Sequence, residues 1–414
     1  MNVPGFIGAA YLARSPSQDA QRCVNLYVET DEALLGPQRG VYQTLSSGTA
    51  PAMLLGSPGL RRFCVLPDTA GGVRGLWTEN SQGRCFAVCG ATLYELFAGG
   101  TFLARGTLGT TSGPVSMADN GLELIIVDGS PRGFLLTLAS NVYTEIRSDG
   151  FYGADRVAFF DGYFVLNRPD TQQLYISKAL AGGTYDALEF ASVEGQPDPL
   201  VTLEVERREL LVLGTRSGEV WFDAGTADFP LAPIQGTSFP LGCAAPHSLR
   251  CMGYHLWLGR DKDGTALVLR LNGYQPERIS THALEFALNS YARIDDAVGW
   301  VEQREGHSWY GLSFPTGNAT WVYDMATKLW HERADLAPTG LLQRHRCECH
   351  AFAFGLHLAA GANDGRVYES SLDVFDNDGD PLVRRRTGAV IYNEGRLMYF
   401  SLFELSAQMG VGRE

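Results

Sequence analysis

CFAVCGATLYELF (residues 85–97) contains the unit that decides the fold: an apolar strand, a tight turn and a second apolar strand. Six further copies of this unit follow, at residues 121–138, 162–177, 208–223, 254–271, 308–324 and 355–371. The last apolar residues before the seven turns are separated by 39 to 56 residues, and they are Val88, Val127, Leu166, Leu213, Leu258, Phe314 and Ala359. A repeat of this length with several strands per unit is typical of the blades of a β-propeller.

The turns and strands of the repeat support the same architecture. Asp128-Gly129, Asp263-Gly264 and Asp364-Gly365 supply residues that tolerate the positive φ angles of tight hairpins. Strands such as ELLVL (209–213) are apolar on both faces, as expected where sheets are stacked against sheets on either side. We therefore predict an all-β fold, a β-propeller of six or seven blades, closed by pairing of early with late strands.

The segments outside the repeat define the remaining organisation. THALEFALNSYARI (281–294) predicts a short inserted helix that begins after Thr281 as its N-cap, and it accounts for the longest repeat spacing. Residues 1–55 predict an extended N-terminal arm, and residues 56–372 the blades. Residues 373–414 predict C-terminal strands that complete or flank the propeller, with RRRTGAVIYN (384–393) and GRLMYFSLFELSAQM (395–409) paired as a hairpin.

Composition excludes several classes of protein. The net charge is -13, whereas a protein that grips nucleic acid carries a basic surface. Arginines number thirty and lysines three, a bias that favours bidentate contacts between proteins. The N-terminus has no signal-peptide pattern, and no stretch reaches the ~20 apolar residues of a membrane helix. We expect synthesis in a reducing cytosol, free thiols at all eight cysteines, and no membrane anchoring.

Two clusters are candidates for metal ions. His345, Cys347, Cys349 and His350 are zinc-ligand types, but the two cysteines are one residue apart, whereas zinc-ligand pairs are usually separated by two to four. We interpret them as ordinary residues of an edge strand. DVFDNDGD (373–380) resembles part of a calcium loop, but a match puts a valine at the first ligand position and Arg385 at the last. We interpret it as a solvated loop between blades, and we expect no cofactor and no metal.

Catalytic motifs give no support for an enzyme. The sequence has no G-x-S-x-G, no H-E-x-x-H and no Gly-Lys dipeptide, which excludes a P-loop. The recurring tryptophans Trp221, Trp257, Trp309, Trp321 and Trp330 are expected to pack in the core rather than to hold a ligand. With 46 acidic residues, a carbohydrate-active propeller, either a glycosidase or a lectin, stays open as an alternative, as does a scaffold for peptides.

Two terminal stretches carry a resemblance to a known family. YLARSPSQDAQRCVNLYVE (11–29) and PLVRRRTGAVIYNEGRLMYFSLFELSAQMGVG (381–412) resemble the opening and the late strands of the tail hub, or nozzle, proteins of short-tailed bacteriophages, the packaged-DNA stabilisation family. Members usually continue beyond the GVG segment, whereas this chain ends at Glu414, so we expect a differently built last blade or an incomplete C-terminus. The residues that carry the opening resemblance, and that we expect to bind partners, are Tyr11, Arg14, Ser15, Asp19, Gln21, Arg22, Asn25, Leu26, Tyr27 and Glu29.

The resemblance implies a structural virion protein of the tail, assembled in the host cytoplasm, and no enzyme. It implies a homo-oligomeric ring of about six copies below the portal and adaptor ring, which extends the DNA ejection channel and retains packaged DNA. Further partners would be a tail plug, needle or fibre protein, with only passing contact with DNA. Because a basic lumen would hold DNA, we expect acidic residues to outnumber arginine on the channel wall.

The N-terminal arm has two interpretations in the sequence. It is polar and aperiodic but carries Tyr11, Leu26 and Tyr27, a composition typical of segments that become ordered on a partner. The alternative is that it packs on its own propeller as a closing strand.

Overall fold

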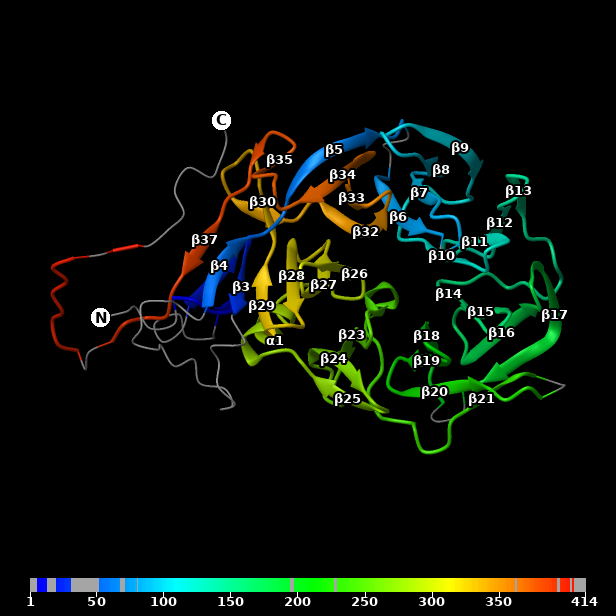
Figure 1. Ribbon diagram of the computed structural model, residues 1–414. Coiled ribbons are helices and arrows are strands. Elements are labelled where there is room, and N and C mark those ends of the chain that lie inside the picture. Colours follow the sequence, from blue (N-terminus) through cyan, green and yellow to red (C-terminus); the bar gives the residue numbers. More distant parts are fainter. Residues whose placement is uncertain are drawn as a thin grey trace.

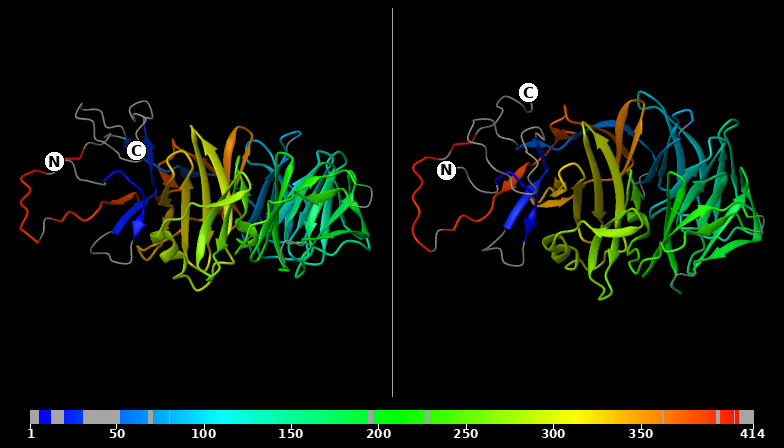
Figure 2. Two further views of the ribbon diagram at one scale, coloured as in Figure 1. Left: turned by 90° about the horizontal axis from the view of Figure 1, so that it is seen from below. Right: turned by 60° about the horizontal axis from the view of Figure 1, so that its bottom comes forward.

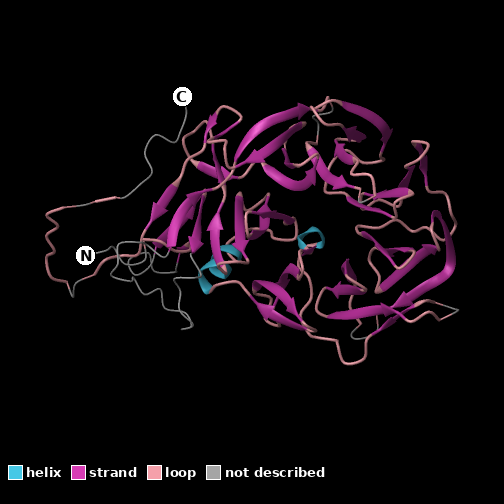
Figure 3. Cartoon of the chain, viewed as in Figure 1, coloured by secondary structure: helices cyan, strands magenta, loops and turns pink. Residues whose placement is uncertain are grey.

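The computed structural model describes residues 6–12, 20–30, 52–67, 71–79, 81–193, 197–226, 229–361, 363–392, 395–402 and 404–405. They form strands and turns with one α-helix and one 3₁₀ turn, η1 (Pro246–Ser248). The strands make a ring of sheets around a central axis (Figures 1 and 3). The β-propeller that the repeats predict is confirmed.

Five of the sheets consist of four consecutive antiparallel strands each, and the first four of them are blades 1 to 4. Blade 1 contains β6 (Val73–Thr78), β7 (Cys85–Cys89), β8 (Thr92–Leu96) and β9 (Phe102–Thr107). Blade 2 contains β10 (Ser116–Asp119), β11 (Glu123–Val127), β12 (Gly133–Thr137) and β13 (Val142–Glu145). Blade 3 contains β14 (Val157–Phe160), β15 (Tyr163–Asn167), β16 (Gln173–Lys178) and β17 (Ala181–Ser192). Blade 4 contains β18 (Leu200–Glu206), β19 (Glu209–Gly214), β20 (Gly218–Asp223) and β21 (Leu231–Pro233).

Three more sheets complete the ring. Blade 5 contains β22 (Arg250–Cys251), β23 (His255–Arg260), β24 (Ala266–Asn272) and β25 (Gln275–Arg278). Blade 6 contains β26 (Val298–Arg304), β27 (His307–Phe314), β28 (Ala319–Asp324) and β29 (Leu329–Glu332). Blade 7 contains β32 (Cys347–Ala353), β33 (Leu356–Gly361), β34 (Arg366–Ser371) and the early strand β5 (Gly59–Val65). The described residues therefore form seven blades.

The ring is closed by a strand from near the N-terminus. β5 pairs antiparallel with β34 from Gly59↔Ser371 to Val65↔Arg366, so the last blade is built from both ends of the propeller sequence. The innermost strand of blade 7, β32, contacts β26 on one side and β6 on the other. This is the closure that the sequence predicts, and it makes separation of the blades dependent on breaking a sheet.

Buried hydrophobic clusters join neighbouring blades. Phe86 and Val88 of blade 1 belong to one cluster with Ile126 and Phe134 of blade 2, and comparable clusters lie at five further junctions. At the junction of blades 6 and 7 the two adjoining clusters each stay with one blade. That junction is therefore held by other contacts, which are described below.

The predicted helix is present and is shorter than its pattern. α1 (His282–Leu288) lies between β25 and β26, so it is an insertion between blades 5 and 6. The backbone N–H of Leu284 donates to the Thr281 hydroxyl, which confirms the predicted N-cap. The helix buries Leu284 and Leu288 in the hydrophobic cluster between these blades.

Further strands lie outside the four-stranded pattern, near blades 6 and 7. They are β1 (Tyr11–Leu12), β2 (Ala20–Val24), β3 (Leu26–Thr30), β4 (Ala52–Gly56), β30 (Ala334–Leu336), β31 (Leu342–Arg344), β35 (Asp376–Asn377), β36 (Asp380–Pro381) and β37 (Arg385–Thr387). In Figures 1 and 2 the arm strands β3 and β4 and the late strand β37 lie together on one side of the ring. The expected hairpin of two late strands is not formed by residues 388–392 and 395–402, which carry no strand; β37 pairs with β2 instead.

The acidic segment 373–380 corrects one expectation. It is not a solvated loop throughout, because β35 pairs in parallel with β5 and antiparallel with β36, which extends the sheet of blade 7. Asn377 is completely buried, and the Asp378 carboxylate accepts a hydrogen bond of 3.0 Å from Arg62 Nε. One of the carboxylates that a calcium loop would offer, that of Asp378, is thus bound to a guanidinium.

The expectations for cysteine and tryptophan agree with the structure. All eight cysteines are free thiols. The five tryptophans that recur in the sequence are buried in the hydrophobic clusters, which confirms their role in core packing. Among the described residues, no helix is long and apolar enough to cross a membrane.

Candidate functional site

The arm adds strands to the outer edge of blade 6. β2 lies parallel to the outermost strand β29 with Val24 opposite Glu332, and it pairs antiparallel with β1 and with β37. Arg22 Nε donates to Glu332 Oε1 at 3.0 Å, and Arg22 Nη2 donates to Glu332 Oε2, a bidentate pair. Bidentate pairing of a guanidinium with a carboxylate fixes both distance and orientation, so Arg22 sets the position of the arm on the blade.

Asn25 joins the arm to two other parts of the chain. It has φ of 52° between β2 and β3, a left-handed conformation that asparagine tolerates well. Its side-chain Nδ2 donates to the carbonyls of Ala334 and Val383, both at 2.8 Å, and its Oδ1 accepts from the Ala334 N–H at 2.9 Å. Asn25 is completely buried, and its two hydrogen bonds to Ala334 are shielded from water.

The next residues of the arm bind a histidine of blade 6. His307 Nδ1 lies 2.7 Å from Asp324 Oδ2, and His307 Nε2 lies 2.8 Å from Glu29 Oε2. Hydrogen bonding to Asp324, opposed by burial and reinforced by Glu29, raises the pKa of His307 to about 9. At neutral pH the ring is therefore an imidazolium that donates to one carboxylate of the propeller and one of the arm. Tyr27 packs edge-on against the rings of His307 and Trp309, at 4.9 and 5.1 Å.

Arg386 of β37 connects the N-terminal and C-terminal segments. Its guanidinium donates to the carbonyl oxygens of Phe6, Ala9 and Arg22 and to the Gln21 side chain at 2.7 Å. One side chain therefore joins β37 to the N-terminal segment. The sequence offers Arg384–Arg386 only as a run of three arginines, and nothing in its pattern shows which of them points to the arm.

The structure thus places most of the expected partner-binding residues on their own propeller. Gln21, Arg22, Asn25, Tyr27 and Glu29 make the contacts above, Tyr11 pairs with Gln21 in the β1–β2 ladder, and Leu26 packs against the cluster between blades 5 and 6. Arg14, Ser15 and Asp19 lie outside the described residues. This is the arrangement of the second interpretation of the arm. The residues that complete the site are ones the sequence analysis missed: His307, Asp324, Glu332 and Arg386.

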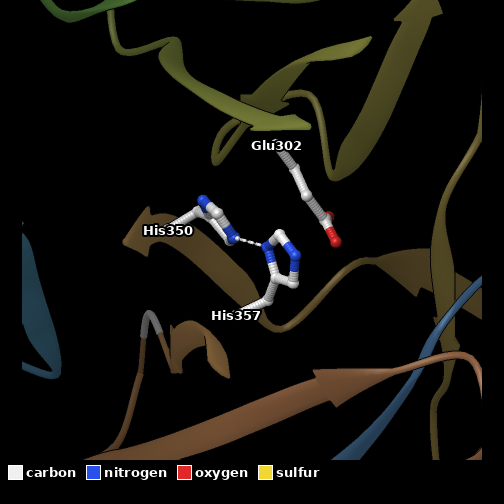
Figure 4. Close-up of side chains that lie close together, drawn as sticks. All are labelled: Glu302, His350 and His357. Atoms are coloured by element: carbon white, nitrogen blue, oxygen red, sulfur yellow. Dashed lines mark hydrogen bonds between the residues drawn. The ribbon is translucent and has the colours of Figure 1, made fainter. Parts of the chain in front are cut away.

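A second polar group lies inside the junction of blades 6 and 7. Of the described residues, one group brings three metal-ligand types together: Glu302 of β26, His350 of β32 and His357 of β33, with one potential ligand atom of each within 4.8 Å of the others (Figure 4). His350 Nε2 lies 3.1 Å from His357 Nδ1. The sequence cluster contributes only His350 to this group. β32 is an edge strand of its sheet, as interpreted from the sequence, but it is the edge that faces the centre of the ring, and His345 and Cys347 are buried.

The electrostatics of this group favour a link between blades over a cation site. Arg304 Nη2 donates to Glu302 Oε1 at 2.7 Å, and Arg333 Nη1 lies 3.3 Å from Glu302 Oε2. Burial alone would raise the pKa of Glu302, but Arg333, His350 and Arg304 lower it to about 2. Both carboxylate oxygens are engaged by guanidinium groups, and a metal ion would have to displace one of them. Arg304 also donates to the Ser370 carbonyl of blade 7 at 2.7 Å, which completes the link.

The two histidines are held neutral in this link. Burial lowers the pKa of His350 to about 4 and also lowers the pKa of His357. Two neutral imidazoles can share one N–H···N hydrogen bond without repulsion. The junction that lacks a shared hydrophobic cluster is thus closed by a buried ion-pair network, supported by the stacking of the Arg333 guanidinium on the Trp300 and Trp309 rings at 5.0 and 4.7 Å.

The sequence of the chain matches a known protein family. Residues 41–354 match the sequence model of the family described as bacteriophage P22 Gp10, beta-propeller, which is more than half of the 414 residues. The chain belongs to the P22 Gp10 family. The match covers most of the propeller and not residues 11–29 or 381–412, so it is independent of the two stretches that carry the resemblance in the sequence. Membership makes this protein a structural component of a bacteriophage virion, and it confirms the family that the sequence resembles.

The similar solved structures support the fold of the chain and nothing beyond it. The extracellular domain of a hybrid two-component system protein from B. thetaiotaomicron aligns with a TM-score of 0.50 at 9% identity, over 76% of this chain and 40% of that chain. The WD40 beta propeller domain of Doa1 aligns with a TM-score of 0.47 at 11% identity, over 76% and 97%. The computationally designed Ika8 protein aligns at 0.43 and 12% identity, over 75% and 99%. No curated protein sequence matches the chain.

Proposed function

We propose that this member of the P22 Gp10 family is a tail hub, or nozzle, protein. Several copies, about six, form a ring below the portal and adaptor ring, extend the DNA ejection channel and retain the packaged DNA. The observation that carries the proposal is the family match across the propeller, residues 41–354. The construction of the molecule supports it, since a part of a pressurised conduit has to be rigid.

Rigidity has a specific origin in this chain. Blade 7 is closed by β5, the junction of blades 6 and 7 is closed by the Glu302 network, and the N-terminal segment is joined to late residues of the chain by Asn25 and Arg386. Each of these links joins residues far apart in the sequence. Local opening of one blade therefore has to break contacts of the others, which suits a protein that transmits force between neighbours.

In this proposal the arm is fixed on blade 6, and its exposed outer side contacts the partner. Its motif residues Arg22, Asn25 and Glu29 are used on blade 6, whereas Leu12 of β1 and Met53 of β4 are 42% and 49% exposed. β1 is the last strand of the extended blade 6 sheet, so it also offers free backbone groups for pairing among the described strands. We place the contact with the adaptor ring on β1 and β4.

Contact with DNA is transient in this proposal. The net charge of -13 gives an acidic average surface, and an acidic wall does not bind DNA by counterion release. The channel follows the axis of the ring of copies rather than the axis of one propeller. DNA is retained by the closed tail and not by affinity for its wall.

The test uses phage particles that lack this protein and the purified full-length chain. Wild-type protein added to the particles should restore nuclease-protected DNA, whereas Leu12→Asp with Met53→Asp should fold normally and fail to restore protection. Leu188→Asp is the matched control, since Leu188 is 83% exposed on blade 3, away from the arm. If the arm variant protected the packaged DNA as well as the wild type does, the assignment of the adaptor contact to β1 and β4 would be wrong. Failure of the wild-type protein to protect DNA would contradict the tail-hub function.

A further inference from the structure

An exposed apolar segment leaves blade 6 after β37. Residues 388–392, 395–402 and 404–405 carry no strand, and Figure 1 shows the part of this segment that the structure describes extending away from the ring. Tyr399 is 87% exposed and Tyr392 is 77% exposed. The large exposed apolar side chains of this stretch are Val390, Ile391, Tyr392, Leu397, Tyr399, Phe400, Leu402 and Leu405.

The composition of this segment indicates a covered strand. Aromatic and aliphatic residues dominate, and the charged side chains among its described residues are Arg396 and Glu404, one of each sign. A single exposed leucine needs no explanation, but a contiguous run of this kind marks an interaction site. The residues are also good strand formers. The segment is therefore suited to lie along an apolar surface of another molecule.

The same chain carries a second exposed apolar surface on another side of the ring. We define the aromatic patch as Phe97 and Phe102 of blade 1 with Phe352 and Phe354 of blade 7; these side chains are at least 37% exposed. The two halves meet at Phe63 of β5. The Phe63 ring stacks on Phe354 at 6.3 Å, and the Phe63 carbonyl lies against Gly100 in the turn between Phe97 and Phe102.

We propose that the exposed segment of one copy, residues 388–392, 395–402 and 404–405, docks on the aromatic patch of a neighbouring copy of this chain. The inference rests on the proposed function, because it names the contact that joins copies in the ring. Each copy supplies both surfaces, so no other protein is needed to cover either of them. In sequence, residues 388–405 carry Glu394, Arg396 and Glu404, a net charge of only -1, which adds little repulsion to the approach of another acidic copy.

The positions of the two surfaces make the contact head-to-tail. In Figure 1 the segment leaves the ring near β37, whereas β9 and β32, which carry Phe102 and Phe352 of the patch, lie elsewhere in the ring. Two different surfaces give a heterologous interface, which forms a closed ring when the rotation between copies closes. An isologous dimer would instead need the segment and the patch of each copy to meet those of the other across one two-fold axis. Segment docking therefore predicts rings and not symmetric dimers.

The experiment changes each surface separately in the full-length chain. The segment variant is Tyr399→Asp with Leu402→Asp, and the patch variant is Phe97→Asp with Phe352→Asp. The control is Leu122→Asp with Leu188→Asp, which adds the same charges at residues 57% and 83% exposed on blades 2 and 3. Native mass spectrometry reports the copy number, and hydrogen exchange reports the protection of residues 388–402.

We expect rings for the wild type and the control, and monomers for each of the two variants alone. Mixed together, the two variants retain one intact contact per pair, so we expect a 1:1 heterodimer and no ring. Wild-type rings in which residues 388–402 remain unprotected, or a mixture that stays monomeric, would overturn the inference and leave the tail-hub function standing. Rings formed by the segment variant that no longer bind the portal and adaptor would assign the segment to that partner and also overturn it. A wild type that forms no ring would remove the ring from the proposed function as well.

Discussion

Replacement of Asn25 by glycine should release the arm while leaving the propeller folded. The change keeps a residue that accepts φ of 52° and removes three hydrogen bonds: two buried ones with the Ala334 carbonyl and N–H, and a part-buried one to the Val383 carbonyl. A buried group left without its partner costs about 1–3 kcal/mol, and carbonyls tolerate this better than N–H groups. We therefore expect the free energy of opening of the arm to fall by about 3 kcal/mol.

The assay is native-state hydrogen exchange of the amides in β2 and β3. A loss of about 3 kcal/mol corresponds to about a hundredfold faster exchange. Asn25→Ala should exchange faster still, because a left-handed conformation costs alanine about 1 kcal/mol more than glycine. Asn141→Gly is the control, since Asn141 has φ of 58° in an exposed turn of blade 2. Unchanged protection of residues 20–30 in Asn25→Gly would refute the assignment of Asn25 as the anchor of the arm.

Three other changes test the remaining contacts. The pKa of His307 is raised to about 9, so the charged ring contributes fully to stability below the ordinary pKa of 6.5, and this contribution is lost as the pH rises through about 9. The difference in melting temperature between wild type and His307→Gln should therefore shrink when it is measured from pH 6 to pH 10. Glu302→Gln leaves Arg304 and Arg333 without a buried carboxylate and should lower the free energy of unfolding by about 3–5 kcal/mol in denaturant titration; a loss below 1 kcal/mol would contradict the inter-blade link. Thr281→Ala removes the N-cap of α1 and should lower the stability of the helix by about 1 kcal/mol. Hydrogen exchange should become faster in the amides of the helix and stay unchanged elsewhere.

The sequence predicts the middle of each blade well. All seven repeated units are the second and third strands of a blade, for example β7 with β8 and β33 with β34. These strands are buried on both faces, so their composition alone identifies them. The innermost strands vary from two residues in β22 to seven in β26, and outer strands such as β13 are partly exposed. Their patterns are weak, and this is why the sequence leaves the choice between six and seven blades open.

The candidate site is much harder to predict from the sequence. Arg22 finds Glu332 across 310 residues and Asn25 finds Val383 across 358 residues. Such contacts exist only after the ring closes, so no local pattern can show them. The motif of residues 11–29 indicates a region whose polar side chains make specific contacts. The same polar residues, however, suit a contact with a partner as well as a contact with the chain's own blade. The Glu302 group was hidden for the same reason, since its members come from three strands of two blades.

For the C-terminal hairpin the sequence predicts strands that the described residues do not form. Its residues have the composition of strands, but those that the structure describes lie exposed and unpaired in the strand ladders beyond Thr387. Strand composition records what a segment can do next to a suitable partner. In this protein that partner is not supplied by residues 395–402 of the same chain, which is why the segment became the basis of the proposed contact between copies.

The mass of the native complex tests the central claim most directly. The full-length chain should be measured alone and mixed with the phage portal and adaptor ring. A discrete complex of several copies, formed or stabilised by that ring, is the result that a tail hub predicts. A monomer whose mass does not change on addition of the portal and adaptor ring would contradict it.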